Sequence, residues 1–475
     1  MSDLGEAQVD AQAEEISAIA CPVFATCFVV TSIADSGPGT LRQAILDANA
    51  TAGDTFISFN IENLPPPIVI LPVTQLPALN GDTRIAGYTQ PGSARATDTT
   101  QPDIHIVING GFANPGASGL VLLNEGNLVE GVAVNDFPAY GIVVNGTGNT
   151  VRGTMVGVDR AASFTRPNRL AGIRLGEGGG NLIGGARISD RNVVSGNEGQ
   201  GIQIISSDNE VYGNAIGTDF DGDVALGNLK SGIGIYGSGG NEVGGTGEGE
   251  RNIVAHNQEH GIFVSAGTEN TLSQNLVHDN GRLGIDLTGD GVTKNDGLLD
   301  PDVGANDLQN FPGLKTALLD PSTEFEGKFK AEVDWQLKSE ARTKYRVEFF
   351  ASGECDPSNH GEGERFLGSR AIDTDATGLA ENLWVLPGRV YPDEVITATA
   401  TKFVRIDGAY VATSTSEFSK CLEVEFCSGD SCGGDGEDDP CPNDVCEDPE
   451  DPCGDDACED DRDEDPCPED ACDSR

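Results

Sequence analysis

Two acidic loops in the middle of the chain contain the residues best suited to bind a metal ion. The loops read "DFDGD" and "DLTGDGVTKNDG", and their carboxylates are Asp219, Asp221, Asp223, Asp286, Asp290 and Asp296. Hard oxygen ligands grouped around glycine in a short loop suit Ca²⁺. Carboxylates this close repel one another unless a cation or open solvent offsets their charge. We therefore expect Ca²⁺ at these loops. Solvated turns are the alternative, because neither loop has the EF-hand spacing.

A fixed offset of 60 residues relates two acidic and two basic candidates for a binding surface. Asp159 and Asp219 are separated by this distance. So are Arg191 and Arg251, which lie in the equivalent sequences "RNVV" and "RNIV". We expect these four residues on the binding surface. A catalytic residue has no need to recur at a repeat period, so the recurrence favours the alternative that both arginines anchor equivalent loops.

Histidines and aromatic residues of the same region give weaker signals. His256, His260 and His278 could form a site, but histidines on surface turns are the simpler interpretation. The aromatic residues are too widely spaced in the sequence to indicate a platform for stacking sugars; they are Phe164, Tyr212, Phe220, Tyr236 and Phe263.

The elements that position these residues follow a repeat. Glycine followed by an apolar residue opens a segment at Gly119, Gly141, Gly172, Gly201, Gly232, Gly261 and Gly284. After each of the first six openings comes an asparagine with an apolar residue two positions later, at Asn127, Asn149, Asn181, Asn209, Asn241 and Asn270. The segments between them are short, rich in β-forming residues and free of helical periodicity. Three short strands and three turns in about 22 residues make one coil of a parallel β-helix.

Stacked coils turn residues at one phase into ladders, because successive coils lie about 4.8 Å apart. We expect an interior apolar ladder of Ile142, Ile173, Ile202, Ile233 and Ile262. The six asparagines should form a hydrogen-bonded ladder at a sharp turn, since asparagine tolerates left-handed backbone. Coils of 31 and 29 residues alternate, so the offset of 60 residues is two turns of the solenoid. The loops that lengthen these coils are the expected binding face.

The chain as a whole is expected to be all-β with four parts. Residues 1–27 are a leader without defined structure, 28–310 a right-handed parallel β-helix with an N-terminal cap, and 311–427 an antiparallel β-sandwich. Residues 428–475 are an acidic tail, expected to be disordered apart from Cys-x₄-Cys pairs that each close their own small ring.

Two local patterns support the cap and the sandwich. Leu41, Ile45 and Ala48 share one face of a short helix, which covers the apolar end of the solenoid. From about residue 311, period-two segments such as "YRVEFFA" alternate with turns, as in a β-sandwich. Cys355 and Cys421 could be bridged within it.

Charge and composition exclude several classes of partner. The net charge is −48, which argues against nucleic acid or anionic lipid as a partner. The sequence has no apolar run long enough to span a membrane. Twelve cysteines in an acidic chain indicate an oxidising compartment. We therefore expect a secreted or cell-surface monomer, although the first residues do not form a signal peptide as written.

The core resembles secreted bacterial right-handed parallel β-helix repeat proteins. "GTLRQAI" at residues 39–45 is similar to the Cys-Ser-Leu-Arg-Glu-Ala motif that precedes such helices, a type related to the polymorphic outer-membrane family. Leu41, Arg42 and Ala44 match that motif strictly. The resemblance covers about residues 28–310 and implies the fold. It does not choose between the lyases, hydrolases, epimerases and adhesins built on this coil.

The sequence favours a non-catalytic protein that presents a long surface to a carbohydrate or another cell-envelope component. The alternative is a polysaccharide lyase, hydrolase or epimerase that acts on an acidic glycan. The chain lacks the galacturonase-type signature and the Asp-Pro-Lys-Gly-His motif of mannuronan epimerases. Two or three acids clustered with an arginine or lysine and with shifted pKa values would favour the enzyme.

Overall fold

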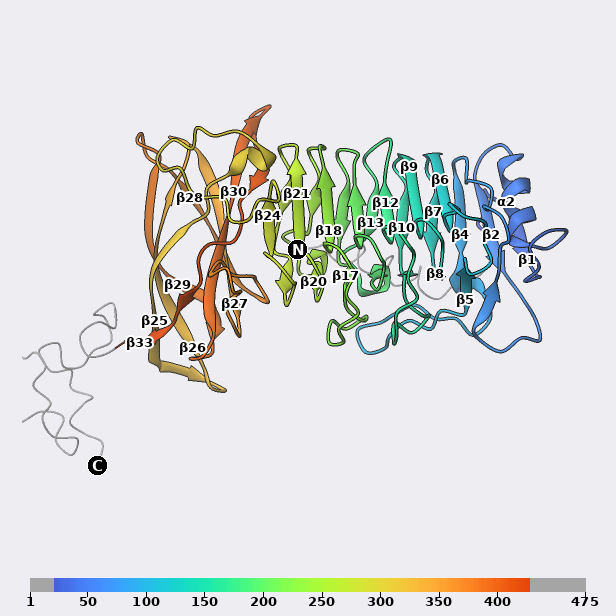
Figure 1. Cartoon of the computed structure of the whole chain (residues 1–475), viewed down its shortest axis with the longest axis horizontal. Helices are drawn as coiled ribbons and strands as arrows, with labels where there is room; N and C mark the ends of the chain where they lie inside the picture. Colours follow the sequence, from blue (N-terminus) through green and yellow to red (C-terminus); the bar gives the residue numbers. More distant parts are fainter. Residues whose placement is uncertain (1–20, 428–475) are drawn as a thin grey trace, which may run out of the picture. The chain divides into compact units, whose positions relative to one another are not determined.

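Short strands separated by glycine and asparagine wind into the right-handed parallel β-helix that the repeat predicts (Figure 1). The computed structural model describes residues 21–427. From β4 onward, each coil contributes one strand to each of three parallel sheets. The nine-stranded sheet is ordered β1 (Thr26–Val30), β2 (Thr55–Phe59), β4 (Thr83–Ala86), β7 (Leu128–Glu130), β10 (Thr150–Arg152), β13 (Leu182–Gly184), β16 (Glu210–Tyr212), β19 (Glu242–Val243) and β22 (Thr271–Leu272).

The other two sheets complete the coils. The eight-stranded sheet is ordered β23 (Leu276–His278), β20 (Ile253–Ala255), β17 (Ala215–Ile216), β14 (Val193–Val194), β11 (Met155–Val156), β8 (Val132–Asn135), β5 (Ile106–Asn109) and β3 (Ile68–Ile70). The seven-stranded sheet is ordered β24 (Ile285–Leu287), β21 (Ile262–Ala266), β18 (Ile233–Tyr236), β15 (Ile202–Ile204), β12 (Ile173–Leu175), β9 (Ile142–Thr147) and β6 (Leu120–Glu125). Short 3₁₀ turns interrupt the loops at η1 (Gly87–Thr89), η2 (Ile188–Asp190), η3 (Glu248–Glu250) and η4 (Ala305–Leu308).

The predicted interior ladder of isoleucines is confirmed. Ile142, Ile173, Ile202, Ile233 and Ile262 are register partners in consecutive strands of the seven-stranded sheet, and all are fully buried. Burying each of these side chains is worth about 2–3 kcal/mol relative to leaving it exposed. The ladder therefore supplies much of the energy that holds the coils together.

The predicted asparagine ladder is confirmed as well. Asn127 donates through Nδ2 to Oδ1 of Asn149 at 2.8 Å, and the same side-chain hydrogen bond joins every following pair as far as Asn270. The backbone N–H of each asparagine donates to the same oxygen of the next. Asn306 of η4 adds a last step by accepting from Asn270.

Two further asparagine ladders follow the other two turns of the coil. One joins Asn192, Asn214, Asn252 and Asn275, and the other joins Asn168, Asn197, Asn228, Asn257 and Asn280. The sequence interpretation missed both. The second could have been found, because each of its members stands four residues before a repeat glycine, as Asn168 does before Gly172.

Helix α2 (Leu41–Asn49) is the predicted cap. Thr40 accepts the backbone N–H of Gln43 at 3.2 Å, which fixes the first turn of the helix. The helix buries Leu41, Ala44 and Ile45 on the first coils and continues the apolar core. The folded chain begins before the expected boundary at residue 28, because β1 starts at Thr26 and Cys21 is linked to Cys27.

The C-terminal part is the expected β-sandwich, with one parallel edge pair. One sheet is ordered β29 (Leu379–Val390), β26 (Lys328–Lys338), β25 (Gly313–Phe325) and β33 (Glu425–Phe426), and β25 pairs with β33 in parallel. The other is ordered β28 (Arg365–Asp373), β27 (Lys344–Ser352), β30 (Val395–Ile406) and β31 (Ala409–Thr415), with β32 (Leu422–Glu423) beside β30. The bridge between Cys355 and Cys421 is confirmed.

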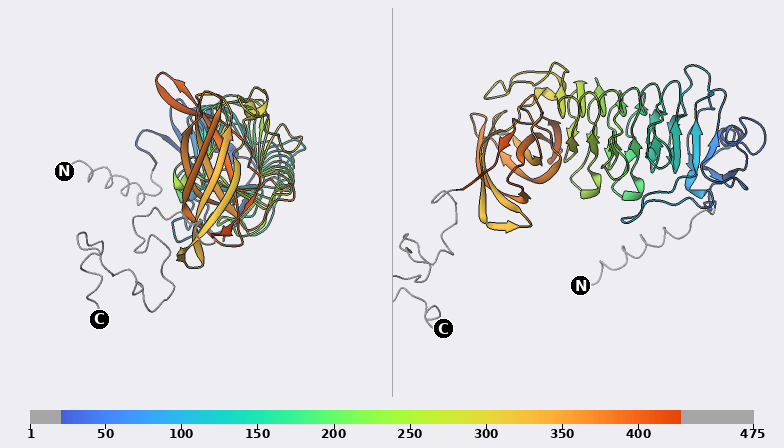
Figure 2. Two further views of the ribbon diagram at one scale, coloured as in Figure 1. Left: turned by 90° about the vertical axis from the view of Figure 1, so that its left-hand side faces the viewer. Right: turned by 60° about the horizontal axis from the view of Figure 1, so that its bottom comes forward.

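The sandwich follows the last coil (Figure 2). Its side chains complete the hydrogen bonds of that coil. Oε1 of Glu362 accepts both the backbone N–H and the Nδ2 of Asn280, at 3.3 and 3.0 Å. In the earlier coils these bonds go to the Oδ1 of the next asparagine. Glu417 and Glu348 accept the backbone N–H groups of Leu287 and Gln274 in the same way. Buried glutamates thus take the place of a further coil.

The protonation of these glutamates should make the stability of the junction between the solenoid and the sandwich depend on pH. Burial raises the pKa of Glu362 and of Glu417 to about 7. Between about pH 4.5 and 7, the folded chain therefore keeps protons on these two carboxyl groups that the unfolded chain loses. The stabilisation that the protonated glutamates contribute is complete in acid and is lost as the pH rises through 7. We expect the unfolding free energy to fall across this window by on the order of 3 kcal/mol per group.

Denaturant unfolding of the variant Glu362→Gln tests this expectation, because its amide oxygen accepts the same bonds at every pH. The variant should lose less stability than the wild type between pH 5 and 8. Exposed Glu364→Gln is the matched control. Equal pH profiles for the wild type and Glu362→Gln would contradict the assignment.

Two expectations concern residues beyond the described part. The disorder expected for the tail and the pairing of its cysteines lie outside residues 21–427, apart from Cys427 itself. Within the described residues, no helix is both long and apolar enough to cross a membrane.

Candidate functional site

The outward face of the seven-stranded sheet carries a continuous row of aromatic and polar side chains. Arg174, Gln203, Gly234, Phe263 and Asp286 are register partners in consecutive strands from β12 to β24. Their neighbours in sequence point into the core, so these positions point out. With coils about 4.8 Å apart, the row extends over about 19 Å.

Further aromatic rings lie beside the residues of this row. Tyr236 lies over Gly234, where a Cβ atom would stand only 2.8 Å from the ring. Tyr236 meets Phe263 edge-on at 5.7 Å between ring centroids, and Phe263 stacks on His260 at 5.9 Å. At the other end Arg174 lies over the ring of Tyr140 at 5.5 Å. We call the set Tyr140, Arg174, Gln203, Tyr236, His260 and Phe263 the outer row.

Polar atoms of the outer row are poorly satisfied within the described residues. Arg174 Nε and Gln203 Oε1 are shielded from solvent and have no hydrogen-bond partner there. Each unpaired buried polar atom costs about 1–3 kcal/mol. Gln200 instead donates to the Tyr236 hydroxyl.

At one end of the outer row, His260 lies beside the buried Asp286. His260 Nδ1 and Asp286 Oδ2 face each other at 3.3 Å, although not in hydrogen-bond geometry. Burial lowers the pKa of His260 and raises the pKa of Asp286, which favours the uncharged pair. Asp286 also accepts the backbone N–H of Gly289 at 2.7 Å.

A second polar cluster lies on the nine-stranded sheet around Glu130. Its carboxylate is buried and accepts from Arg84 Nε at 3.0 Å, pairs with Arg95 Nη2 at 2.7 Å and accepts from Arg152 Nε at 3.1 Å. Arg152 also reaches Asp190 at 3.4 Å. The sequence interpretation missed this cluster. Its members do not recur at the repeat period.

The pKa values of the two acids of this cluster are shifted in opposite directions. Burial alone would raise the pKa of Glu130, but Arg95 and Arg84 outweigh it and lower that pKa. For Asp190, burial outweighs the attraction of Arg152 and raises the pKa. Environments that shift the pKa values of two acids in opposite directions are a feature of acid–base sites. Structural ion-pair networks produce the same shifts.

The predicted binding residues of the loops are used within the protein. Asp159 accepts the backbone N–H groups of Ser163 and Phe164, at 2.6 and 2.9 Å. Asp219 accepts those of Gly222, Asp223 and Val224 at 2.9–3.0 Å. Both carboxylates therefore organise equivalent loops.

The two repeated arginines have different surroundings. Arg191 donates to the carbonyl oxygens of Gly213 and Phe220, at 3.2 and 2.9 Å, and so anchors the loop that contains Asp219. Arg251 donates to Gln274 and lies over the ring of Phe366 in the sandwich at 4.7 Å.

The structure does not bring either expected calcium set together. Among residues 21–427, two groups of three histidine or acidic residues place their ligand atoms within 4.8 Å, and neither is the set Asp219, Asp221, Asp223 or the set Asp286, Asp290, Asp296. Asp221 accepts from Gln101, and Asp290 accepts from Thr288. Calcium binding by these loops stays a prediction.

Asp296 gathers with partners that the sequence interpretation did not name. It forms one of the two groups with Asp300 and Asp302. Burial raises the pKa of Asp300 to about 6, and the backbone N–H of Asn310 donates to this carboxylate at 3.2 Å.

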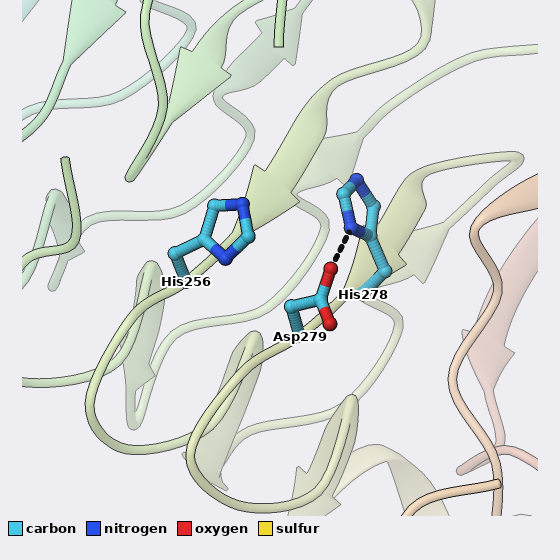
Figure 3. A group of neighbouring side chains, drawn as sticks. All are labelled: His256, His278 and Asp279. Carbon is cyan, nitrogen blue, oxygen red and sulfur yellow. Dashed lines mark hydrogen bonds and ion pairs between the residues drawn. The ribbon is translucent and has the colours of Figure 1, made fainter. Parts of the chain in front are cut away.

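The three histidines considered together in the sequence are separated by the fold. His256 and His278 lie at the ends of neighbouring strands, with ring centroids 5.8 Å apart, and Asp279 joins them as the second group of possible metal ligands (Figure 3). His260 instead belongs to the outer row.

A cavity of about 380 Å³ lies where the last loop of the solenoid meets the sandwich. It is lined by Val292, Lys294, Asn295, Phe311, Ser358, His360 and Lys420. Within the described residues neither lysine has an ion pair. Two lysines without an ion pair in the described part of the chain therefore line the cavity.

Comparison with known proteins supports the fold and does not identify an activity. No curated protein matches the chain. Tailspike protein 2 (TSP2, ORF211) from Escherichia coli O157:H7 bacteriophage CAB120 aligns with 83% of this chain and 64% of that chain, at 13% identity and a TM-score of 0.20. The chain thus spans less than two thirds of the tailspike, and so low a score supports no argument. Residues 114–296 match the family model described as a right handed beta helix region, so this segment is a right-handed parallel β-helix.

Proposed function

We propose that the solenoid binds a carbohydrate chain along the outer row and does not process it. The observation that carries this proposal is the row of Arg174, Gln203 and Phe263 at one outward phase of the coils. In the coil between Gln203 and Phe263, the ring of Tyr236 lies over Gly234 and meets Phe263 edge-on. Aromatic rings present flat apolar faces to the C–H groups of sugars, while amide and guanidinium groups pair with hydroxyls. The coil spacing of about 4.8 Å is close to the length of one sugar unit, so successive coils meet successive units.

The alternative is hydrolysis or elimination at the cluster around Glu130. It is supported by the opposite pKa shifts of Glu130 and Asp190 and by their shared contact with Arg152. Against it, the Glu130 side chain is only 1% exposed and is surrounded by three guanidinium groups. A nucleophile or base needs a free lone pair that can reach the substrate. We therefore assign this cluster to structure.

The proposal places the protein outside the cytoplasm, at the cell surface or secreted. Two disulfides hold the described part, Cys21–Cys27 and Cys355–Cys421, and such bonds persist in oxidising compartments. The resemblance of "GTLRQAI" to the motif of exported bacterial β-helix proteins supports the same location.

Glycan-array binding of the full chain, followed by affinity measurement on each hit, tests the proposal. We expect Tyr236→Ala and Phe263→Ala each to lower the affinity about tenfold, which corresponds to about 1.4 kcal/mol of lost stacking. Phe164→Ala is the matched control, because this exposed ring lies over Arg166 on a loop and not in the outer row. Unchanged affinity in both outer-row variants would exclude the outer row as the site.

An assay for reducing ends and unsaturated products on the same glycans separates the two functions. A binder leaves the glycan intact. Product that forms with the wild type and disappears with Asp190→Asn would establish the enzymatic alternative.

A further inference from the structure

In the last two coils of the solenoid, the turn that follows the eight-stranded sheet carries two imidazoles and a carboxylate. His256 follows β20, His278 ends β23, and Asp279 follows it. One ligand atom from each lies within 4.8 Å of the other two, and His278 Nδ1 is 2.8 Å from Asp279 Oδ2 (Figure 3). Both histidines are half-buried, and the carboxylate is exposed.

The repeat shows which residues the fold itself requires at this turn. The sequence Val-x-x-Asn occurs as "VSGN" at 194–197, "VAHN" at 254–257 and "VHDN" at 277–280. The asparagines Asn197, Asn257 and Asn280 belong to one ladder, so the three turns are structurally equivalent. His256 and Asp279 therefore occupy the position that Gly196 fills in the earlier coil.

This position has left-handed backbone. The φ angle is +73° at Gly196, +59° at His256 and +53° at Asp279. Glycine adopts this conformation freely, whereas other residues pay about 1 kcal/mol. Asp136 of an earlier coil holds the equivalent position with a φ angle of +58°. The position thus takes glycine or a polar residue, and in the last two coils the polar residue is a potential metal ligand. Strained backbone of this kind is concentrated at functional sites.

We propose that His256, His278 and Asp279 bind one divalent transition-metal ion. Two imidazole nitrogens and one carboxylate oxygen suit Zn²⁺ and the neighbouring borderline ions, and they do not suit Ca²⁺. Three protein ligands leave a fourth tetrahedral position for water or for an oxygen of a partner molecule. The net charge of −48 raises the concentration of cations around the chain. This site is separate from the outer row and does not depend on the proposed carbohydrate.

The earlier coil supplies substitutions that remove ligands without harming the fold. His256→Gly and Asp279→Gly restore the residue of Gly196, and His278→Ser restores the residue at the position of Ser195. We expect the two glycine variants to be as stable as the wild type without metal, or more stable, because glycine relieves the left-handed backbone. Their loss of metal binding would then not be a consequence of unfolding.

Isothermal titration of the metal-free full chain with Zn²⁺, and with Co²⁺ as a spectroscopic probe, measures the site. The protein must carry no polyhistidine tag, and free thiols must be blocked first, because cysteines also bind zinc. We expect one equivalent to bind, and a higher melting temperature in its presence. His256→Gly and His278→Ser should each weaken binding at least tenfold. His105→Gln, a histidine outside the group, should bind as the wild type does.

The outcomes separate the proposal from its competitors. Zn²⁺ binding lost in His256→Gly and His278→Ser but kept in His105→Gln supports it. An imidazole-type Co²⁺ spectrum that disappears in the same variants supports it independently. The absence of binding by the wild type, or equal affinity in the wild type and both variants, would overturn it.

Discussion

Replacing Asn209 with alanine should destabilise the solenoid by about 4 kcal/mol. Asn209 Oδ1 accepts both the backbone N–H and the Nδ2 of Asn181, at 3.2 and 2.9 Å, and the side chain is fully buried. Alanine leaves both donors without a partner, at about 1–3 kcal/mol each. It also removes the hydrogen bond from Asn209 Nδ2 to Asn241.

Urea unfolding monitored by two probes measures this effect. The two tryptophans of the chain, Trp335 and Trp384, both lie in the sandwich, so fluorescence reports on the sandwich and circular dichroism on all the sheets. Asn127→Ala is the matched control, because Asn127 begins the ladder and accepts from Gly81 N–H alone. It should cost about half as much. A loss below about 1 kcal/mol for Asn209→Ala would show that the ladder contributes little to stability.

Replacing Glu130 with glutamine should cost about 3 kcal/mol. The carboxylate is surrounded by Arg84, Arg95 and Arg152, and its removal leaves three guanidinium groups around a neutral amide. Breaking a buried ion pair in this way costs about 3–5 kcal/mol. We take the lower end because each of these arginines is about one third exposed, so water screens part of the repulsion.

The pH dependence of this loss identifies its origin. The pKa of Glu130 is lowered in the folded chain, so its stabilisation is present above its unfolded pKa and is lost as the pH falls through the folded value. The difference between the wild type and Glu130→Gln should therefore shrink in acid. Exposed Glu125→Gln should change stability by less than about 0.5 kcal/mol. Retained glycan binding by the folded Glu130→Gln protein would agree with a structural role.

The sequence repeat made the residues that recur at its period predictable, but not the contacts between unlike residues on neighbouring coils. Asp159 and Asp219 recur at the repeat period, and the structure gives them the same task in equivalent loops. Tyr236 and Phe263 looked scattered because 27 residues separate them in the sequence. One coil brings their rings to 5.7 Å. Two residues that meet on neighbouring coils give no repeat pattern in the sequence when they differ in type.

The calcium expectation stays a prediction, and it depends on a distinction that the sequence does not make. Alternate carboxylates in a short loop look like a ligand set, but the loop uses Asp219 to bind its own backbone N–H groups. A carboxylate that organises its loop through local hydrogen bonds has the same sequence signature as a metal ligand. Side-chain direction separates the two, and only the folded loop determines it.

The sequence by itself determined the β-helix, its phase, its cap and the sandwich. These follow from local pattern, because every coil must bury the same positions and stack them on the next, as Ile142 and Asn127 do. The tertiary structure alone decided which unlike residues meet across coils and at the junction. Glu130 gathers three arginines, His256 meets His278 and Asp279, and Glu362 accepts from Asn280. The physical reason is that these contacts depend on strand register and on loops of unequal length, which carry no periodic signal.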